Sequence, residues 1–104
     1  MDITYTNYLK IDELLELQEL KSNPPEHDET LFIIIHQTYE LWFKQIIHEF
    51  GKVNAELNAG NTWAALKTLR RILTIMKTLV SQVDILETMT PLEFNSFRSF
   101  LGQS

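Results

Sequence analysis

Apolar residues recur every three or four positions along most of the chain, which is the spacing of one face of an α-helix. Three stretches rich in turn-forming residues interrupt this repeat: Pro24-Pro25, residues 58–61 and Thr90-Pro91. No alternating run of β-branched residues bounded by hairpin turns is present in the sequence. The pattern therefore predicts four helices joined by short connections, and an all-α fold.

The bounds of these helices follow from residues that commonly cap helix ends. Asp28 is a good N-cap for the second helix. Thr90, Pro91 and Glu93 give the fourth helix an N-cap, a first-turn proline and a capping-box acid. The predicted helices cover residues 8–21, 28–58, 62–89 and 91–101, and the first of them shares residues 1–22 with an N-terminal tyrosine arm.

The second and third helices are long and their connection is short, so we expect them to pack as an antiparallel pair within a single helical domain, residues 1–104. Apolar residues lie along one broad face of the second helix and form a stripe on the third. The stripe of the second helix consists of Phe32, His36, Phe43, Ile47 and Phe50, and that of the third consists of Leu66, Leu69, Leu73, Met76, Leu79 and Val83.

The second helix has large apolar side chains around nearly its whole circumference, including Tyr39, Trp42 and the run 33–35. A helix that is apolar all round is buried on all sides. A chain of 104 residues supplies little material to cover it. We therefore expect oligomerisation, or cover from further protein segments.

Composition narrows the class of protein. The net charge of -5 disfavours a surface for nucleic acid or for anionic membranes, both of which require basic residues. The chain has no cysteine, which excludes disulfides and thiolate chemistry. The N-terminus lacks the pattern of a signal peptide, and the longest apolar run, 31–35, is far too short to span a bilayer. These features predict a cytoplasmic protein.

The three histidines differ in their surroundings. His27 and His48 lie beside acidic residues and are expected to be solvated or capping. His36 lies inside an apolar helix, where it is either a core histidine with one hydrogen bond or a polar group aimed into a ligand pocket. His36 and His48 are twelve residues apart on one helix, roughly 18 Å, so they cannot share a metal ion within one chain. No metal site is predicted.

Arg98 shares a face of the fourth predicted helix with Phe94 and Leu101. It is either an arginine whose stem covers apolar surface or a fork that binds a carboxylate. Tyr5 and Tyr8 lie on the N-terminal arm, and two aromatic residues on a terminus usually dock on a protein surface. That surface belongs either to the chain's own core or to a neighbouring subunit.

Four segments resemble the tryptophan 2,3-dioxygenase family, in the family's order and spacing. The strongest is Leu31 to Glu49, LFIIIHQTYELWFKQIIHE, which resembles the family's signature helix. It is preceded by HDE at His27 to Glu29. The outer two are TYTNYLKIDELLELQ at Thr4 to Gln18 and LETMTPLEFNSFRSFLG at Leu86 to Gly102. The resemblance runs along the whole chain, which corresponds to the N-terminal third of such a protein.

The resemblance implies roles for individual residues. His36 matches the distal histidine, which lies above the haem and hydrogen-bonds the indole N–H of the substrate. Arg98 matches the arginine that binds the substrate carboxylate. Further substrate-binding roles are implied for Phe32, Phe94 and Leu101 in the pocket, and for Tyr5 and Tyr8 reaching in from a neighbouring subunit.

The resemblance also implies a reaction and an assembly. The family uses haem b to insert O2 across the indole C2–C3 bond of L-tryptophan, giving N-formylkynurenine in the kynurenine pathway, and it forms a homotetramer. The family's proximal iron ligand has no counterpart in this chain. We therefore expect this chain alone to bind haem weakly or not at all. Two hypotheses remain: part of a dioxygenase, or a non-catalytic helical oligomer of the same family.

Overall fold

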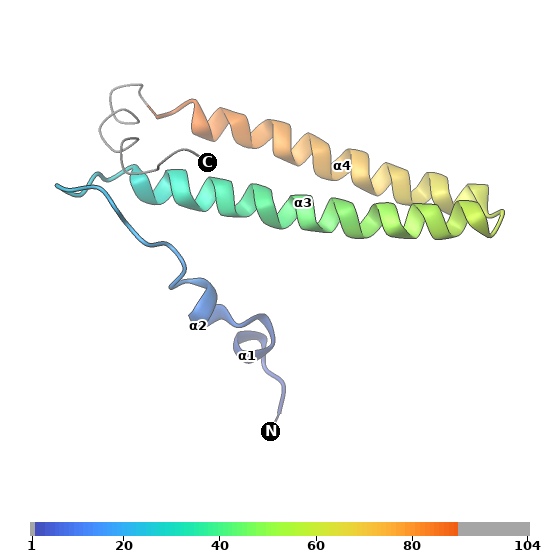
Figure 1. Cartoon of the computed structure of the whole chain (residues 1–104), viewed down its shortest axis with the longest axis horizontal. Coiled ribbons are helices and arrows are strands. Elements are labelled where there is room, and N and C mark those ends of the chain that lie inside the picture. The colour runs from blue at the N-terminus through green and yellow to red at the C-terminus, as the bar shows by residue number, and fades with distance from the viewer. Residues whose placement is uncertain (1, 90–104) are drawn as a thin grey trace. The chain divides into compact units, whose positions relative to one another are not determined.

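The structure, a computed structural model of the chain, describes residues 2–89. Helices account for most of these residues and no strand occurs among them, so the all-α fold is confirmed. The helices are α1, Tyr5–Leu9; α2, Ile11–Leu14; α3, Glu29–Asn58; and α4, Thr62–Leu86 (Figure 1). The predicted helix over 91–101, with Phe94, Arg98 and Leu101, lies outside the described residues. Two compact parts, 2–34 and 35–89, are described separately below.

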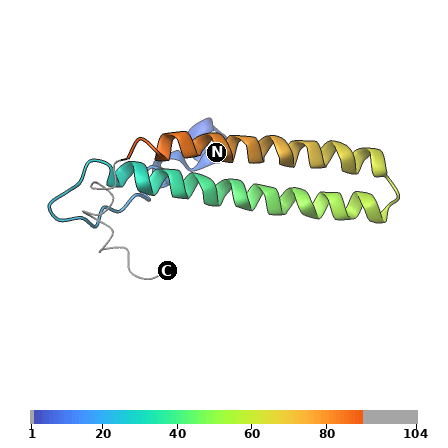
Figure 2. The same ribbon diagram turned by 90° about the horizontal axis from the view of Figure 1, so that it is seen from above.

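Helices α3 and α4 form the antiparallel pair that the sequence predicts, and they run side by side in both ribbon views (Figure 1, Figure 2). The chain reverses direction over residues 59–61. Gly60 has φ +75, a left-handed conformation that side chains disfavour, which explains the glycine at this turn. The side-chain oxygen of Asn61 then accepts a hydrogen bond of 3.2 Å from the backbone N–H of Ala64 and caps the start of α4.

The two helices meet along a seam whose residues are separated alternately by three and four positions, the spacing of coiled-coil contacts. All of these residues are buried or half-buried. On α3 the seam consists of Ile35, Tyr39, Trp42, Ile46, Glu49, Val53 and Glu56, and on α4 it consists of Ala65, Thr68, Ile72, Ile75, Leu79, Gln82 and Leu86. Its apolar centre, around Ile46 and Ile72, is the core of this part of the molecule.

The seam does not use most of the stripes expected from periodicity. On α4, Leu73 is 60% exposed and Leu66 is 54% exposed, whereas the adjacent stripe that contains Ile72 is buried. On α3, Ile47 is 71% exposed and Phe43 is also exposed. The stripe of the third predicted helix therefore meets the partner helix only in part, through Leu69 and Leu79, which pack against the core. Both helices carry two apolar stripes, and only the packing of the pair decides which of them is inside.

The single helix predicted over 8–21 was also wrong. The chain forms the two short helices α1 and α2, separated at Lys10, which has a left-handed backbone with φ 53. Thr4 and Asn7 form a reciprocal capping box that starts α1 at Tyr5, three residues earlier than expected. Leu17 is 59% exposed and Leu20 is 51% exposed, so these leucines gain little from burial, and a short helix without such packing is marginal in water.

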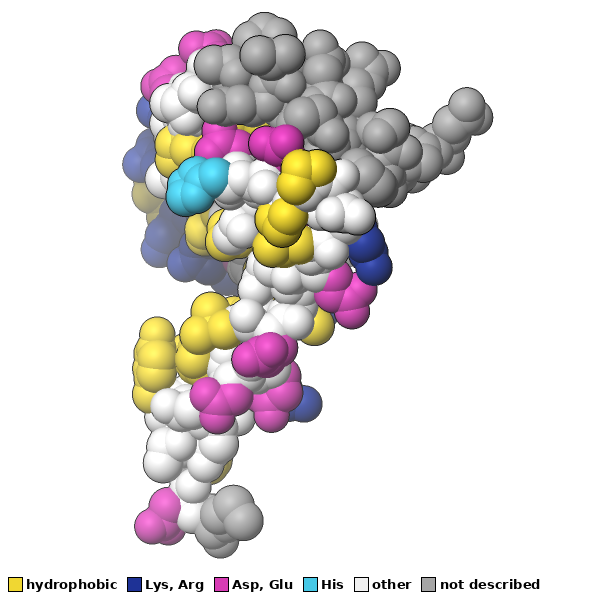
Figure 3. Space-filling view, turned by 90° about the vertical axis from the view of Figure 1, so that its left-hand side faces the viewer, with side chains coloured by type: hydrophobic (Ala, Val, Ile, Leu, Met, Phe, Trp, Pro, Cys, Tyr) yellow, Lys and Arg dark blue, Asp and Glu magenta, His cyan; other side chains and the backbone are white. Residues whose placement is uncertain are grey.

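The N-terminal segment nevertheless keeps an amphipathic character. In Figure 3, hydrophobic side chains gather on one side of this segment and acidic side chains gather on the other. Among its large apolar residues, Leu14 and Leu20 are exposed. None of the helices described here is both long enough and apolar enough to cross a membrane.

The seam predicts that alanine substitutions at two neighbouring aliphatic residues of α4 lower the free energy of unfolding by different amounts. Ile72→Ala should lower the free energy of unfolding by about 2–5 kcal/mol, because it empties a fully buried position. Leu73→Ala should cost less than about 1 kcal/mol, because its side chain is mostly exposed. Urea denaturation followed by circular dichroism measures both. An equal loss from Leu73→Ala at every protein concentration would contradict the assignment of the seam.

Candidate functional site

The predicted site residues fall on different elements of the structure. Tyr5 and Tyr8 lie three residues apart in α1, so they share one side of that helix, and both are mostly exposed. Phe32 lies in the first turns of α3 and is half-buried. His36 is exposed on α3 and is the predicted site residue that belongs to residues 35–89.

The start of α3 is held by a buried carboxylate. Glu29 is 1% exposed, and its two carboxylate oxygens accept hydrogen bonds from Lys21 and Ser22 in the loop before α3. One oxygen accepts from the backbone N–H of Lys21 at 2.8 Å. The other accepts from the backbone N–H of Ser22 at 3.1 Å and from its hydroxyl at 2.7 Å. Glu29 therefore ties residues 21–22 to the first turn of α3, and closes the loop between them.

These contacts also decide the ionisation of Glu29. Burial by itself would raise the pKa of this carboxyl, because it removes the charged form from water. The hydrogen bonds from Lys21 and Ser22, with the positive charge of Lys21, outweigh that effect and hold the pKa of Glu29 below its ordinary value of 4.5. The ionised carboxylate is thus part of the folded structure at neutral pH.

His36 belongs to a row of aromatic rings on α3. Its imidazole lies edge-on to the ring of Tyr39, with centroids 6.4 Å apart and planes inclined by 75°. Tyr39 in turn is stacked on Phe43, with centroids 6.1 Å apart and planes inclined by 15°. Such aromatic pairs contribute about 0.5–1.5 kcal/mol each beyond the burial of their area. The hydroxyl of Tyr39 donates a hydrogen bond of 3.0 Å to the backbone oxygen of Leu79 in α4.

One polar residue of the α4 seam, Gln82, lies at the same end of the hairpin as this row. Gln82 lies one turn beyond Leu79, just as His36 lies one turn before Tyr39, so the antiparallel register places Gln82 level with His36. The side-chain oxygen of Gln82 is buried and has no hydrogen-bond partner among residues 2–89. This end of the seam therefore contains a free acceptor, whereas the centre around Ile72 is apolar.

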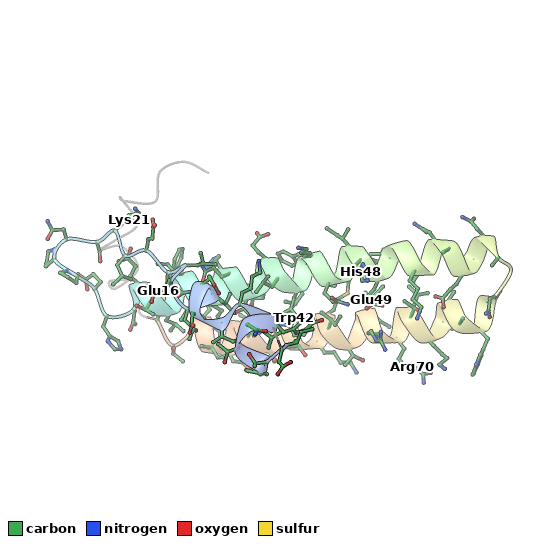
Figure 4. All side chains as sticks on the ribbon, turned by 90° about the horizontal axis from the view of Figure 1, so that it is seen from below. Glu16, Lys21, Trp42, His48, Glu49 and Arg70 are labelled. Carbon is green, nitrogen blue, oxygen red and sulfur yellow. The ribbon has the colours of Figure 1, made fainter. Side chains whose placement is uncertain are left out.

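Further along the seam, buried acidic groups are paired with polar groups. Glu49 is 4% exposed and lies between the two helices, as Figure 4 shows, with Arg70 on the side of α4 away from α3. The carboxylate of Glu49 accepts a hydrogen bond of 2.6 Å from Gln45 and lies 3.5 Å from the guanidinium of Arg71. Glu56 accepts a hydrogen bond of 2.7 Å from the hydroxyl of Thr68. Because these pairs connect specific positions, they favour one register of α3 against α4.

Two open pockets lie on the hairpin. One, of about 310 Å³, is lined by Lys52, Glu56, Ala64, Lys67, Thr68 and Arg71. The other, of about 390 Å³, is lined mainly by apolar side chains of α4, including Trp63 and Leu73. Neither contains His36 or another predicted site residue. In the part of the chain that the structure describes, no three His, Cys, Asp or Glu side chains are grouped to hold a metal ion.

Two residues of this arrangement were not identified from the sequence as site residues. Glu29 was named in the sequence only as the last residue of the HDE segment, and its contacts with Lys21 and Ser22 depend on the path of the loop. Tyr39 was noted only as part of the apolar surface. The spacing of three residues between His36 and Tyr39 was the available signal, since it places both on one side of a helix.

Comparison with known proteins identifies relatives along the whole chain. A family model described as tryptophan 2,3-dioxygenase matches residues 1–104. The tryptophan 2,3-dioxygenase of Herpetosiphon aurantiacus is 62% identical over 99 residues, which cover 95% of this chain and 38% of that protein. The protein of the same name from Anaeromyxobacter sp. strain K is 56% identical over 99 residues, which cover 95% of this chain and 37% of that protein.

A more distant organism has a similar protein. The tryptophan 2,3-dioxygenase of the mosquito Aedes aegypti is 50% identical over 106 aligned positions, which cover 94% of this chain and 27% of that protein. The chain thus spans between 27% and 38% of the length of these three relatives.

The contacts of Glu29 predict a local response to acid and to substitution. Glu29→Gln replaces one of the two carboxylate oxygens with an amide NH2 group, which cannot accept a hydrogen bond. Either the backbone N–H of Lys21 or that of Ser22 therefore loses its acceptor. Hydrogen exchange of these two amides, measured by NMR, should accelerate by roughly tenfold or more. Because the folded pKa is lowered, the stabilisation is present above the unfolded pKa, about 4.5, and is lost as the pH falls through the folded pKa.

The matched control is Glu19→Gln, whose carboxylate is mostly exposed and pairs with the ammonium of Lys21. This change should leave the exchange of the Lys21 and Ser22 amides nearly unaltered. The difference between the wild-type protein and Glu29→Gln should shrink at acidic pH. A difference that stays constant down to pH 2 would show that the charge of Glu29 does not hold the loop.

Proposed function

Because the chain belongs to the tryptophan 2,3-dioxygenase family, we propose that it forms the substrate-facing part of a haem-dependent tryptophan 2,3-dioxygenase. The reaction inserts both atoms of O2 across the C2–C3 bond of the indole of L-tryptophan and gives N-formylkynurenine, in tryptophan catabolism by the kynurenine pathway. The observation that carries the proposal is the family match along residues 1–104, with 62% identity to one relative.

His36 is the residue to which we assign a direct role in the reaction. An imidazole nitrogen that carries no proton accepts a hydrogen bond from the indole N–H and thereby orients the ring. An orienting role suits this substrate better than proton abstraction, because the indole N–H is a very weak acid. The exposure of His36 on α3 and its ring contact with Tyr39 support this role, since the imidazole is both accessible and held on one side.

We assign the remaining substrate contacts by the resemblance of individual segments. Arg98 binds the substrate carboxylate, and its planar guanidinium suits two parallel hydrogen bonds to one carboxylate. Phe32, Phe94 and Leu101 form apolar walls around the indole. Substrate binding by these residues excludes water from the indole and leaves polar contacts at the N–H and the carboxylate.

Haem is part of the proposal for the whole protein. A haem requires an axial ligand aimed into an apolar slot. The histidines at 27, 36 and 48 are all exposed, and neither of the pockets described above is lined by a histidine. The described residues therefore do not by themselves fit a haem. When bound in the whole protein, haem supplies the activation of O2.

Exposed apolar side chains support a proposal about assembly. Ile47 on α3 and Trp63, Leu73 and Val80 on α4 are each at least 60% exposed. Surfaces of this kind usually bind other protein surfaces. We propose a homo-oligomer, a tetramer by resemblance, in which Tyr5 and Tyr8 of one subunit reach the site of a neighbour. We also propose a cytoplasmic location, in line with the family resemblance.

The second candidate is a non-catalytic helical oligomer of the same family. The same exposed stripe of α4 favours it, because such a stripe requires a partner whether or not the protein is an enzyme. The two candidates differ in haem and in activity. The following two measurements separate them.

In a full-length protein that carries this segment, His36→Leu should lower kcat/KM for L-tryptophan by roughly 10- to 100-fold, the effect of losing one orienting hydrogen bond. His48→Leu is the matched control, because His48 is also exposed on α3 and has no assigned contact with the substrate. It should leave kcat/KM within about twofold. Formation of N-formylkynurenine is followed by absorbance. Unchanged rates in both variants would rule out the orienting role of His36.

Titration of the 104-residue chain with haem should show no stoichiometric binding, because no described histidine lies in an apolar slot. Absorption spectroscopy of the Soret region measures this directly. Haem titrated into buffer without protein and into the full-length protein serves as the negative and the positive control. A Soret band with a six-coordinate histidine signature at one haem per chain is the result that would refute the expectation.

A further inference from the structure

We propose that Tyr39 is a positioning residue for His36, which fixes the orientation of the imidazole and thereby sets the rate of the reaction proposed above. The inference rests on the proposed function only for its kinetic part. Its structural part concerns residues 35–89, where all the contacts that carry it are described.

Tyr39 is held at both ends of its side chain. Its hydroxyl donates a hydrogen bond of 3.0 Å across the seam to the backbone oxygen of Leu79. Its ring is stacked on Phe43, with centroids 6.1 Å apart and planes inclined by only 15°. The hydroxyl therefore ties the ring to α4, and the stack supports it along α3. A half-buried tyrosine with both restraints has little freedom to change rotamer.

The restrained ring then acts on His36. The imidazole lies one turn before Tyr39 and meets its ring at 75°, the edge-to-face arrangement that aromatic pairs prefer. An exposed histidine without such a neighbour samples several rotamers, and ordering it costs conformational entropy when the substrate binds. The contact with Tyr39 favours one orientation in advance.

The choice of tyrosine at this seam position agrees with the proposal. Most other seam positions near the centre carry aliphatic residues, such as Ile46 and Ile72, which would fill the space equally well. A tyrosine brings a hydroxyl that must find an acceptor when it is taken from water. The oxygen of Leu79 provides that acceptor, and it lies in the backbone of the opposite helix. The register of the hairpin therefore controls where the Tyr39 ring, and through it His36, is placed.

The structural part is tested on the 104-residue chain by NMR of the histidine rings. Tyr39→Phe removes only the hydroxyl, and Tyr39→Leu removes the ring as well. We expect the relaxation of the His36 ring signals to move towards that of the exposed His48, partly in Tyr39→Phe and fully in Tyr39→Leu. The signals of His48 should stay unchanged and show that α3 has kept its fold. Unaltered relaxation and chemical shifts of His36 in both variants would overturn the proposal.

The kinetic part is tested in the full-length protein with a double-mutant cycle. Tyr39→Phe should lower kcat/KM roughly 2- to 10-fold, and it should have no further effect in a protein that already carries His36→Leu. A merely structural role would lower the rate in both backgrounds alike. The matched control is Phe50→Leu, an exposed aromatic residue of α3 outside the row around His36, which should leave kcat/KM unaffected.

The outcomes separate this inference from the proposed function. A normal rate in His36→Leu would refute the role of His36 in catalysis, while the NMR result would still decide whether Tyr39 orients its ring. A slow His36→Leu protein with a fully active Tyr39→Phe protein would overturn the kinetic part of the present inference alone. Equal losses from Tyr39→Phe with and without His36 would overturn it as well.

Discussion

The seam between α3 and α4 combines a dry apolar centre with paired polar groups, and most of the described structure depends on this combination. Burial of Ile46 and Ile72 drives the two helices together, because it removes apolar surface from water. That force has little preference among registers. The buried carboxylate of Glu49 has such a preference, since a slip along the seam would separate it from Arg71 and leave a charge unpaired. Register in turn decides which backbone oxygen of α4 meets Tyr39.

The outer faces of the hairpin pose the opposite problem. Stripes containing Ile47 on α3 and Leu73 on α4 are as apolar as the seam, yet they are exposed. Exposed apolar stripes on both helices are costly for a protein that works alone in water. The chain spans between 27% and 38% of the length of the three relatives compared above. The polar residues of the seam thus contribute to the contact between α3 and α4, whereas the apolar residues outside it are suited to contacts with other protein surfaces.

The start of α3 shows how a local contact supports the helix that carries His36. Glu29 holds residues 21–22 by three hydrogen bonds, so the loop that precedes α3 is fixed at its end. A charged carboxylate is an expensive group to bury, and only the full set of donors makes its burial acceptable. The N-terminal helices α1 and α2 contain no buried residue and are correspondingly short.

The sequence by itself determined the fold class, the helix α3 to within one residue of its predicted start, and the turn at 58–61, because caps, glycines and helical periodicity act over a few neighbouring residues. The resemblance of the segment around His36 also identified the family. Only the tertiary structure decided which apolar stripe is buried, since Ile72 and Leu73 are equally hydrophobic and differ only in what packs against them. The same holds for Glu29 and Tyr39. Their partners, Ser22 and Leu79, are brought to them by the path of the loop and by the register of two helices, which no local pattern encodes.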